Sequence, residues 1–117
     1  MITGISIHGG AGTIVKSKIT PEKETAYLKA LEESLMRGWE ILQSGKSSLE
    51  AVEGSIRIME DNPLFNAGKG SVFTNEGKHK MDASIMDGKT LNAGAVSAIN
   101  NVKNPILLAK CILENSE

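Results

Sequence analysis

The chain has 117 residues, with 13 basic and 14 acidic side chains and a formal net charge of −1. A hydrophobic fraction of 40% and a charged fraction of 23% are typical of one globular domain and exclude a disordered chain. The charges are interspersed, which argues against nucleic-acid and anionic-membrane partners, and no stretch approaches the ~18 apolar residues of a membrane span. A signal-peptide pattern is also absent. We therefore expect one domain over residues 1–117, without an internal boundary, in the cytoplasm.

The N-terminal stretch predicts a strand followed by a glycine-rich loop. Ile5-Ser6-Ile7 alternates in polarity and leads into His8-Gly9-Gly10-Ala11-Gly12. Residues 10–17 come close to a phosphate-binding pattern, but Val15 stands where that pattern needs glycine. A tight backbone turn is therefore the favoured interpretation of the loop.

Two amphipathic helices follow. Thr20 and Pro21 are typical of a helix start, and Ser44-Gly45 of a helix end. Between them the predicted apolar face consists of five large side chains at helical spacing, Leu28, Leu31, Leu35, Trp39 and Leu42. Ser47 and Glu50 have capping-box spacing and predict a second helix to about Glu60.

The second half of the chain predicts an antiparallel meander and a last helix. Turn residues at positions 75–77 and 87–88 separate three strand-like runs, Ser71–Thr74, Lys80–Met86 and Leu91–Ile99. Asn104-Pro105 is a helix start. The run Ala93–Ile99 is small and apolar, as in a strand covered on both faces, yet three helices supply too few layers for that. The pattern indicates half of a larger sandwich.

Candidate functional side chains are few. The loop from Asn62 to Ser71 could present the Asn66 amide, form a turn, or direct its carbonyl oxygens at a hard cation. His8 could act as a base, but without a neighbouring nucleophile a structural histidine is favoured. Asp82 and Asp87 should point to opposite faces of a strand, which makes them a poor carboxylate pair. The single cysteine, Cys111, lies among apolar residues and is interpreted as a small buried hydrophobe.

Three motifs together resemble one family. Ile7–Gly12, Asn62–Gly70 and Met86–Val96, followed by Asn104-Pro105, are similar in order and spacing to plant-type L-asparaginases/isoaspartyl peptidases, which are N-terminal-nucleophile (Ntn) hydrolases. The resemblance covers essentially all 117 residues. It implies an α+β fold, a partial αββα sandwich with three or four strands and three helices that is incomplete without a second chain.

The resemblance also implies a chemistry. The family's precursor cuts itself before a threonine into α and β chains, which stay together, usually as an (αβ)2 dimer of pairs. The new N-terminal threonine of the β chain then attacks the side-chain amide of asparagine or the isoaspartyl bond of a β-aspartyl dipeptide. Its own α-amine serves as the base.

Several residues match family positions. Asn66 corresponds to the supporting amide near the nucleophile, and the loop His8-Gly9-Gly10-Ala11-Gly12 to a mobile loop behind the cleavage site. A structural sodium ion is implied, with no organic cofactor, bound by the main-chain carbonyls of Met59, Glu60, Asn62, Phe65, Ala67 and Lys69.

The same resemblance places the nucleophile in a later segment. Gly12-Thr13 imitates the scissile Gly-Thr, but cutting there would detach the first strand. We therefore expect residues 1–117 to be inactive and poorly stable alone, associating through the apolar face of Ala93–Ile99. Three alternatives stay open: a piece of a larger enzyme, a truncated product, or a non-catalytic remnant that acts as an interaction module.

Overall fold

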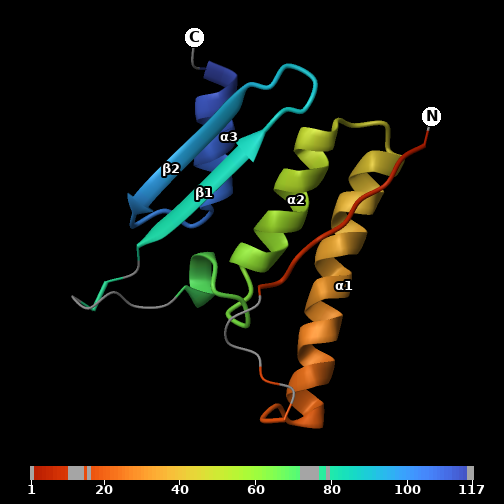
Figure 1. Ribbon diagram of the computed structural model, residues 1–117, viewed down its shortest axis with the longest axis vertical. Helices are drawn as coiled ribbons and strands as arrows, with labels where there is room; N and C mark the ends of the chain where they lie inside the picture. The colour runs from red at the N-terminus through yellow and green to blue at the C-terminus, as the bar shows by residue number, and fades with distance from the viewer. Residues whose placement is uncertain (1, 11–14, 16, 72–76, 79, 116–117) are drawn as a thin grey trace.

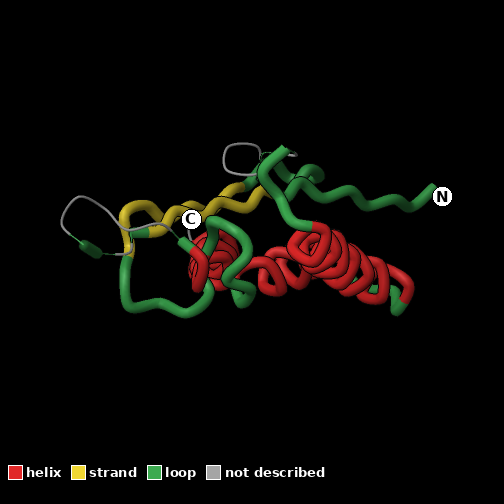
Figure 2. Tube along the Cα trace, turned by 90° about the horizontal axis from the view of Figure 1, so that it is seen from below, coloured by secondary structure: helices red, strands yellow, loops and turns green. Residues whose placement is uncertain are grey.

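The computed structural model describes residues 2–10, 15, 17–71, 77–78 and 80–115. In chain order its elements are α1 (Pro21–Gln43), α2 (Ser48–Glu60), a short 3-10 helix η1 (Gly68–Gly70), β1 (Met81–Met86), β2 (Ala93–Ile99) and α3 (Pro105–Asn115). The helices form one layer, and the β1–β2 hairpin and the N-terminal segment 2–10 lie over the same side of it (Figures 1 and 2). The fold is α+β, and the predicted three helices are confirmed. None of the helices in the described ranges combines the length and apolarity needed to cross a membrane.

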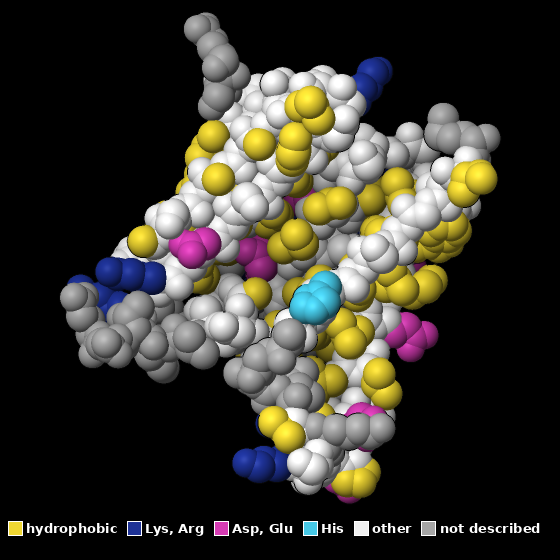
Figure 3. Space-filling view, in the orientation of Figure 1, with side chains coloured by type: hydrophobic (Ala, Val, Ile, Leu, Met, Phe, Trp, Pro, Cys, Tyr) yellow, Lys and Arg dark blue, Asp and Glu magenta, His cyan; other side chains and the backbone are white. Residues whose placement is uncertain are grey.

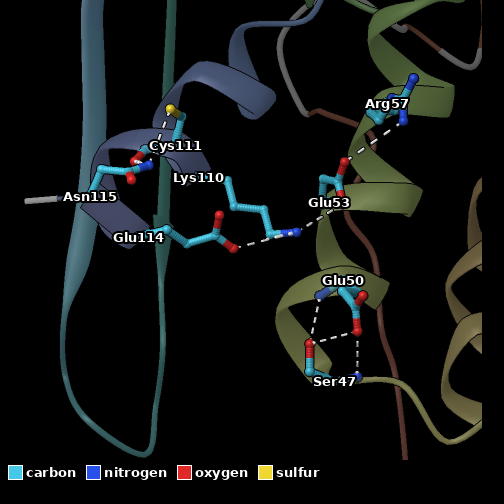
Figure 4. A network of polar contacts seen from close by, with 8 residues as sticks. All are labelled: Ser47, Glu50, Glu53, Arg57, Lys110, Cys111, Glu114 and Asn115. Carbon is cyan, nitrogen blue, oxygen red and sulfur yellow. Dashed lines mark hydrogen bonds and ion pairs between the residues drawn. The ribbon is translucent and has the colours of Figure 1, made fainter.

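Local capping explains where the first two helices begin. The Thr20 hydroxyl accepts a hydrogen bond from the Lys23 N–H at 3.2 Å, and Pro21 occupies the first turn of α1. At α2 the Ser47 side chain accepts from the Glu50 N–H at 3.2 Å, while Glu50 Oε2 accepts from the Ser47 N–H at 2.9 Å (Figure 4). The two hydrogen bonds form the predicted capping box.

The interface between α1 and α2 is made of small residues. Ser34 and Ser55 are buried and donate to each other's main-chain carbonyls, each at 2.8 Å. A Cβ at Gly38 would collide with Ser55 Oγ and with Ile5 Cδ1. The helices therefore approach closely, and the N-terminal segment runs across them (Figure 1), with Ile5 close to Gly38.

This packing corrects the predicted apolar face of α1. The residues that α1 buries are Ala30, Ser34, Gly38 and Ile41. Leu28 is 61% exposed, and the other predicted members are only half-buried, namely Leu31, Leu35, Trp39 and Leu42. The buried line lies beside the predicted one because close helix contact selects small side chains rather than large ones.

The hydrophobic core lies between the hairpin, α3 and α2. Its buried members are Ile85, Ile106 and Ala109, with Leu49, Ile56, Ala83, Val96 and Leu113 packed against them. At Gly94 a Cβ would collide with the Ala109 carbonyl oxygen, so the missing side chain lets α3 lie directly on β2. This contact fixes the covered face of the hairpin.

The other face of the hairpin is open. Its exposed residues include Ser84, Met86, Ala93 and Ala95. All three helices lie on one side of the hairpin, so within the described residues Ala93–Ile99 is covered on one face only (Figure 2). The half-sandwich interpretation fits this arrangement.

The strand count also differs from the expectation. Three or four strands were predicted, and the described residues form two, paired antiparallel. Ile5-Ser6-Ile7 is extended but joins no sheet, since it lies on the helices instead of beside a strand (Figure 1). In the predicted strand Ser71–Thr74, residues 72–74 lie outside the described ranges.

A bulge interrupts the hairpin opposite Asp82. Met81 pairs with Ile99 and Ala83 with Val96, so two residues of β2 face one residue of β1. The Ala98 N–H, displaced from the ladder, donates to Asp82 Oδ1 at 2.7 Å. This hydrogen bond lowers the pKa of Asp82, with a smaller effect from Ser97.

Candidate functional site

A hollow of about 380 Å³ lies where the loop after α2 meets β1. Its floor comes from α2 and α3, and its sides from residues 66–68, Ser71 and the stretch Lys80–Ser84. Ile56, Glu60 and Ile106 line the floor. In the space-filling view, apolar side chains gather in the depression between the hairpin and the N-terminal segment (Figure 3).

Asn66 is held at the side of this hollow by the loop that precedes it. Asn62 Oδ1 accepts from the Leu64 N–H at 3.0 Å, and the Asn62 carbonyl accepts from the Phe65 N–H at 3.3 Å. Phe65 is 4% exposed and meets the Tyr27 ring edge to face, with centroids 6.1 Å apart. The buried Phe65 ring thus anchors a loop whose next residue, Asn66, is exposed.

The predicted autoprocessing loop lies close to the same anchor. A Cβ at Gly9 would lie 2.8 Å from Leu31 Cδ2 and 3.2 Å from Phe65 Cε1. His8 is exposed, and its Nδ1 accepts from the Gly10 N–H at 3.2 Å, which turns the imidazole towards its own loop. Two motifs far apart in sequence therefore meet at Gly9 and Phe65, while Ala11 and Gly12 lie outside the described ranges.

The carbonyl loop predicted to bind sodium is tightly curled. Gly68 has φ +49°, and a Cβ there would lie 2.5 Å from the Glu60 carbonyl oxygen. A Cβ at Gly70 would collide with the Phe65 carbonyl oxygen and lie 2.6 Å from that of Pro63. Gly68 thus lies against one of these carbonyls and Gly70 against the other two, and larger residues at either position would displace them.

Two more of the predicted ligands, the carbonyls of Met59 and Ala67, have an acceptor position to spare. The carbonyls of Met59 and Ala67 each accept one N–H, from Asn62 at 3.2 Å and from Gly70 at 3.0 Å, which leaves a second lone pair on each oxygen. Within the described residues, no group of three or more His, Cys, Asp or Glu side chains could hold a metal. A cation at this loop would therefore need main-chain oxygens, which sodium, as a hard cation, accepts.

The end of α2 and its cap residue bind the start of α3, which the sequence did not indicate. Glu60 is 3% exposed, and its Oε2 accepts from the Ile106 N–H at 3.2 Å. The Asn104 amide donates to Asp61 Oδ1 at 3.0 Å. Two consecutive acids thus hold one helix N-terminus, where negative charge is favourable.

The other carboxylate oxygen of Glu60, Oε1, lies in a different environment from Oε2. Oε1 is buried and has no hydrogen-bond partner in the described part of the chain. Burial raises the pKa of Glu60. Two neighbouring donors, the Ile106 N–H and the Asn104 amide, oppose that rise, but neither makes a hydrogen bond to Oε1. An ionised carboxylate in such a place is costly unless a positive charge compensates it or a proton neutralises it.

Several other charged groups have structural partners. Lys110 Nζ lies 3.4 Å from Glu53 Oε2 and 3.7 Å from Glu114 Oε1, which links α3 to α2 (Figure 4). Asp87 serves a turn, since its side chain accepts from the Lys89 N–H at 2.9 Å. With Asp82 at the bulge, the two aspartates have separate structural partners.

Cys111 corrects another expectation. It was interpreted as a buried hydrophobe, but its side chain is exposed. α3 turns its Ile106 and Ala109 face towards the core, and Cys111 points away from that face. Its Sγ lies 3.5 Å from Asn115 Nδ2, within the same helix (Figure 4).

Comparison with known proteins gives a consistent result. A family model described as asparaginase matches residues 1–117. The chain is 45% identical to an isoaspartyl peptidase of Salmonella typhimurium over 96% of its own length and 36% of that protein. It is 49% identical to a plant-type L-asparaginase of Pyrococcus abyssi, over 99% of its length and 36% of that protein. It is 44% identical to an isoaspartyl peptidase/L-asparaginase of Xenopus laevis, over 97% of its own length and 35% of that protein. The chain therefore spans about a third of the length of these relatives.

Proposed function

The chain belongs to the asparaginase family, and we propose that it forms the N-terminal part of an amidohydrolase that cleaves L-asparagine, β-aspartyl dipeptides or both. The observation that carries this proposal is 45–49% identity to proteins named isoaspartyl peptidase and plant-type L-asparaginase across nearly the whole chain. Because the match covers only 36% of either relative, the catalytic threonine is proposed to lie on a further segment.

The described residues support a scaffolding role for this part. Asn66 is exposed at the side of the hollow on a loop anchored by the buried Phe65 ring. In the proposed enzyme its amide hydrogen-bonds near the threonine that attacks the substrate's amide carbon. The loop beginning at His8 reaches the same anchor through Gly9, in keeping with a place behind the cleavage site.

A sodium ion at the 59–69 loop is part of this proposal. When bound, it would supply a positive charge that holds the main-chain carbonyls in one arrangement. The close approach of the Glu60 carbonyl to Gly68 and of the Phe65 carbonyl to Gly70 supports a compact loop at this point. Stiffening this loop would fix the direction of the Asn66 amide.

The open face of the hairpin supports a partner chain. Ser84, Met86, Ala93 and Ala95 are exposed there, and all three helices lie on the opposite side. We propose that the β chain with its N-terminal threonine completes the sandwich, and that two such pairs associate as (αβ)2. The alternative, a non-catalytic interaction module, uses the same open face for another protein.

The test is an asparaginase and β-aspartyl-dipeptide assay on the purified chain, with intact mass determined on the same sample. We expect no activity at a mass of 12.5 kDa, the mass of residues 1–117. Activity at that mass would refute the missing-threonine proposal and make Thr13 the first residue to substitute. An inactive chain that gains activity when it is produced together with a segment carrying the threonine would support the proposed enzyme over the interaction module.

A further inference from the structure

Glu60 connects three parts of the molecule. It ends α2, its Oε2 binds the N-terminus of α3 through the Ile106 N–H at 3.2 Å, and its main chain contacts Gly68. Its side chain is 3% exposed, and its Oε1 has no hydrogen-bond partner among the described residues. One oxygen of this buried carboxylate therefore makes no hydrogen bond within the described part of the chain.

The same residue belongs to the curled carbonyl loop. The Glu60 carbonyl oxygen would lie 2.5 Å from a Cβ at Gly68, so the end of α2 packs against the later part of this loop. Covalent geometry keeps the side-chain carboxylate of a residue within a few bonds of its own carbonyl. Any cation bound by that carbonyl would consequently sit close to the Glu60 charge.

The carbonyl ligands proposed for the cation supply no negative charge. Six main-chain carbonyls are neutral, and a cation transferred from water into them keeps its full charge. Of the charged side chains in the loop, Asp61 and Lys69 are exposed, and Asp61 already accepts from Asn104 at 3.0 Å. Glu60 is the buried charged side chain in the described part of this loop.

We propose that the Glu60 carboxylate is the counter-charge of the cation held by the 59–69 carbonyl loop. In this role it is a positioning residue: it binds no substrate, but it couples the cation and the Asn66 loop to the start of α3. The inference rests on the proposed sodium site. It explains why a carboxylate is buried at this point with one oxygen unpartnered.

The test measures sodium binding through stability rather than activity. The melting temperature of the assembled protein is followed as sodium replaces tetramethylammonium at constant ionic strength. For the unsubstituted protein the melting temperature should rise with sodium and define a midpoint concentration. Glu60→Gln keeps the size of the side chain and an oxygen that can accept from Ile106, but removes the charge. We expect its sodium midpoint to increase about tenfold or more, the range found for residues that support metal ligands.

Two further variants separate charge from structure. Asp61→Asn removes the adjacent exposed charge and should leave the midpoint nearly unchanged, because solvent screens that group. Glu60→Asp keeps the charge on a shorter side chain. It should lower the melting temperature at every sodium concentration but keep the midpoint well below that of Glu60→Gln, and it serves as the test if Glu60→Gln does not fold.

The outcomes are distinct. An unchanged midpoint in Glu60→Gln, with a uniformly lower melting temperature, would overturn the inference and leave Glu60 as a helix cap. A Glu60→Asp midpoint as high as that of Glu60→Gln would also overturn it, since charge would then not matter. If sodium has no effect on the unsubstituted protein, the sodium site itself is wrong and the inference fails with it. The proposed hydrolase activity would still stand on its own assay.

Discussion

Replacing Gly68 with alanine tests whether the curled loop depends on a glycine at this position. Gly68 has φ +49°, a backbone conformation that residues other than glycine rarely adopt. The added Cβ would lie 2.5 Å from the Glu60 carbonyl oxygen, 2.8 Å from Glu60 Cβ and 2.9 Å from Glu60 Cα. These atoms belong to the end of α2, so they cannot move aside like the tip of a long side chain.

The expected loss of stability has two parts. A left-handed conformation costs a non-glycine residue about 1 kcal/mol or somewhat more. Forcing a methyl group against fixed atoms costs about 1–3 kcal/mol. The reduced freedom of alanine in the unfolded chain returns about 0.5 kcal/mol. We therefore expect Gly68→Ala to lower the free energy of unfolding by about 2–3 kcal/mol.

Urea unfolding followed by circular dichroism measures this difference, and two glycines provide controls. Gly45 has φ +84° with no atom within 4 Å of an added Cβ, so Gly45→Ala reports the conformational cost alone, about 1 kcal/mol. Gly88 has neither a positive φ nor a neighbour within 4 Å, so Gly88→Ala should change stability little. The reasoning would be refuted if Gly68→Ala and Gly45→Ala lost the same stability, because the contact with Glu60 would then contribute nothing.

Four further outcomes are expected. Ser47→Ala should lower the free energy of unfolding by about 1 kcal/mol, measured by thermal melts. The capping hydrogen bonds of Ser47 lower the pKa of Glu50 in the folded state. The stability from the Glu50 charge is thus present above the unfolded pKa and is lost as the pH falls through the folded pKa. The difference in free energy of unfolding between Ser47→Ala and the unsubstituted protein should therefore become smaller in acid. A difference that does not change with pH would contradict the capping-box assignment. Ala98→Gly should stabilise the hairpin by about 0.5–1 kcal/mol, because Ala98 has φ 52°; destabilisation in urea would mean that the bulge is not held as described. Asn66→Ala in the assembled enzyme should reduce kcat on the order of 10²-fold, the effect of removing a catalytic hydrogen-bond donor, with KM little changed; an unaltered kcat would remove Asn66 from the mechanism. The chain alone should self-associate in analytical ultracentrifugation, and Ala95→Lys on the open face of the hairpin should reduce the average mass of the associated species. A monomer with a sharp thermal melt would refute association through this face.

Local chemistry made much of the fold predictable. The starts of α1, α2 and α3 follow from Thr20, Ser47 and Pro105, because a helix cap involves residues within one turn of the chain. The turn at Asp87-Gly88 follows similarly, with the Asp87 side chain accepting from the Lys89 N–H at 2.9 Å. The family could be recognised because its motifs are also local runs of residues.

Tertiary structure decided the choices that local patterns leave open. Periodicity placed large side chains on one face of α1, but contact with α2 buried the adjacent line of small residues such as Ser34 and Gly38. Cys111 lies in an apolar run, yet the rotation of α3 over the hairpin leaves it exposed. In both cases several faces of one helix are apolar enough to be buried, and the partner element selects among them.

The candidate site also has some features that could be predicted from the sequence and others that depend on tertiary contacts. By itself the sequence determined that residues 62–70 form a glycine-rich loop with Asn66 in it, because turn chemistry and the family motif are written in consecutive residues. Only the tertiary structure put Gly9 against Phe65 and the Glu60 carboxylate against the Ile106 N–H, 46 positions away. A buried carboxylate is identified by what surrounds it, and its surroundings come from segments whose meeting no local pattern encodes.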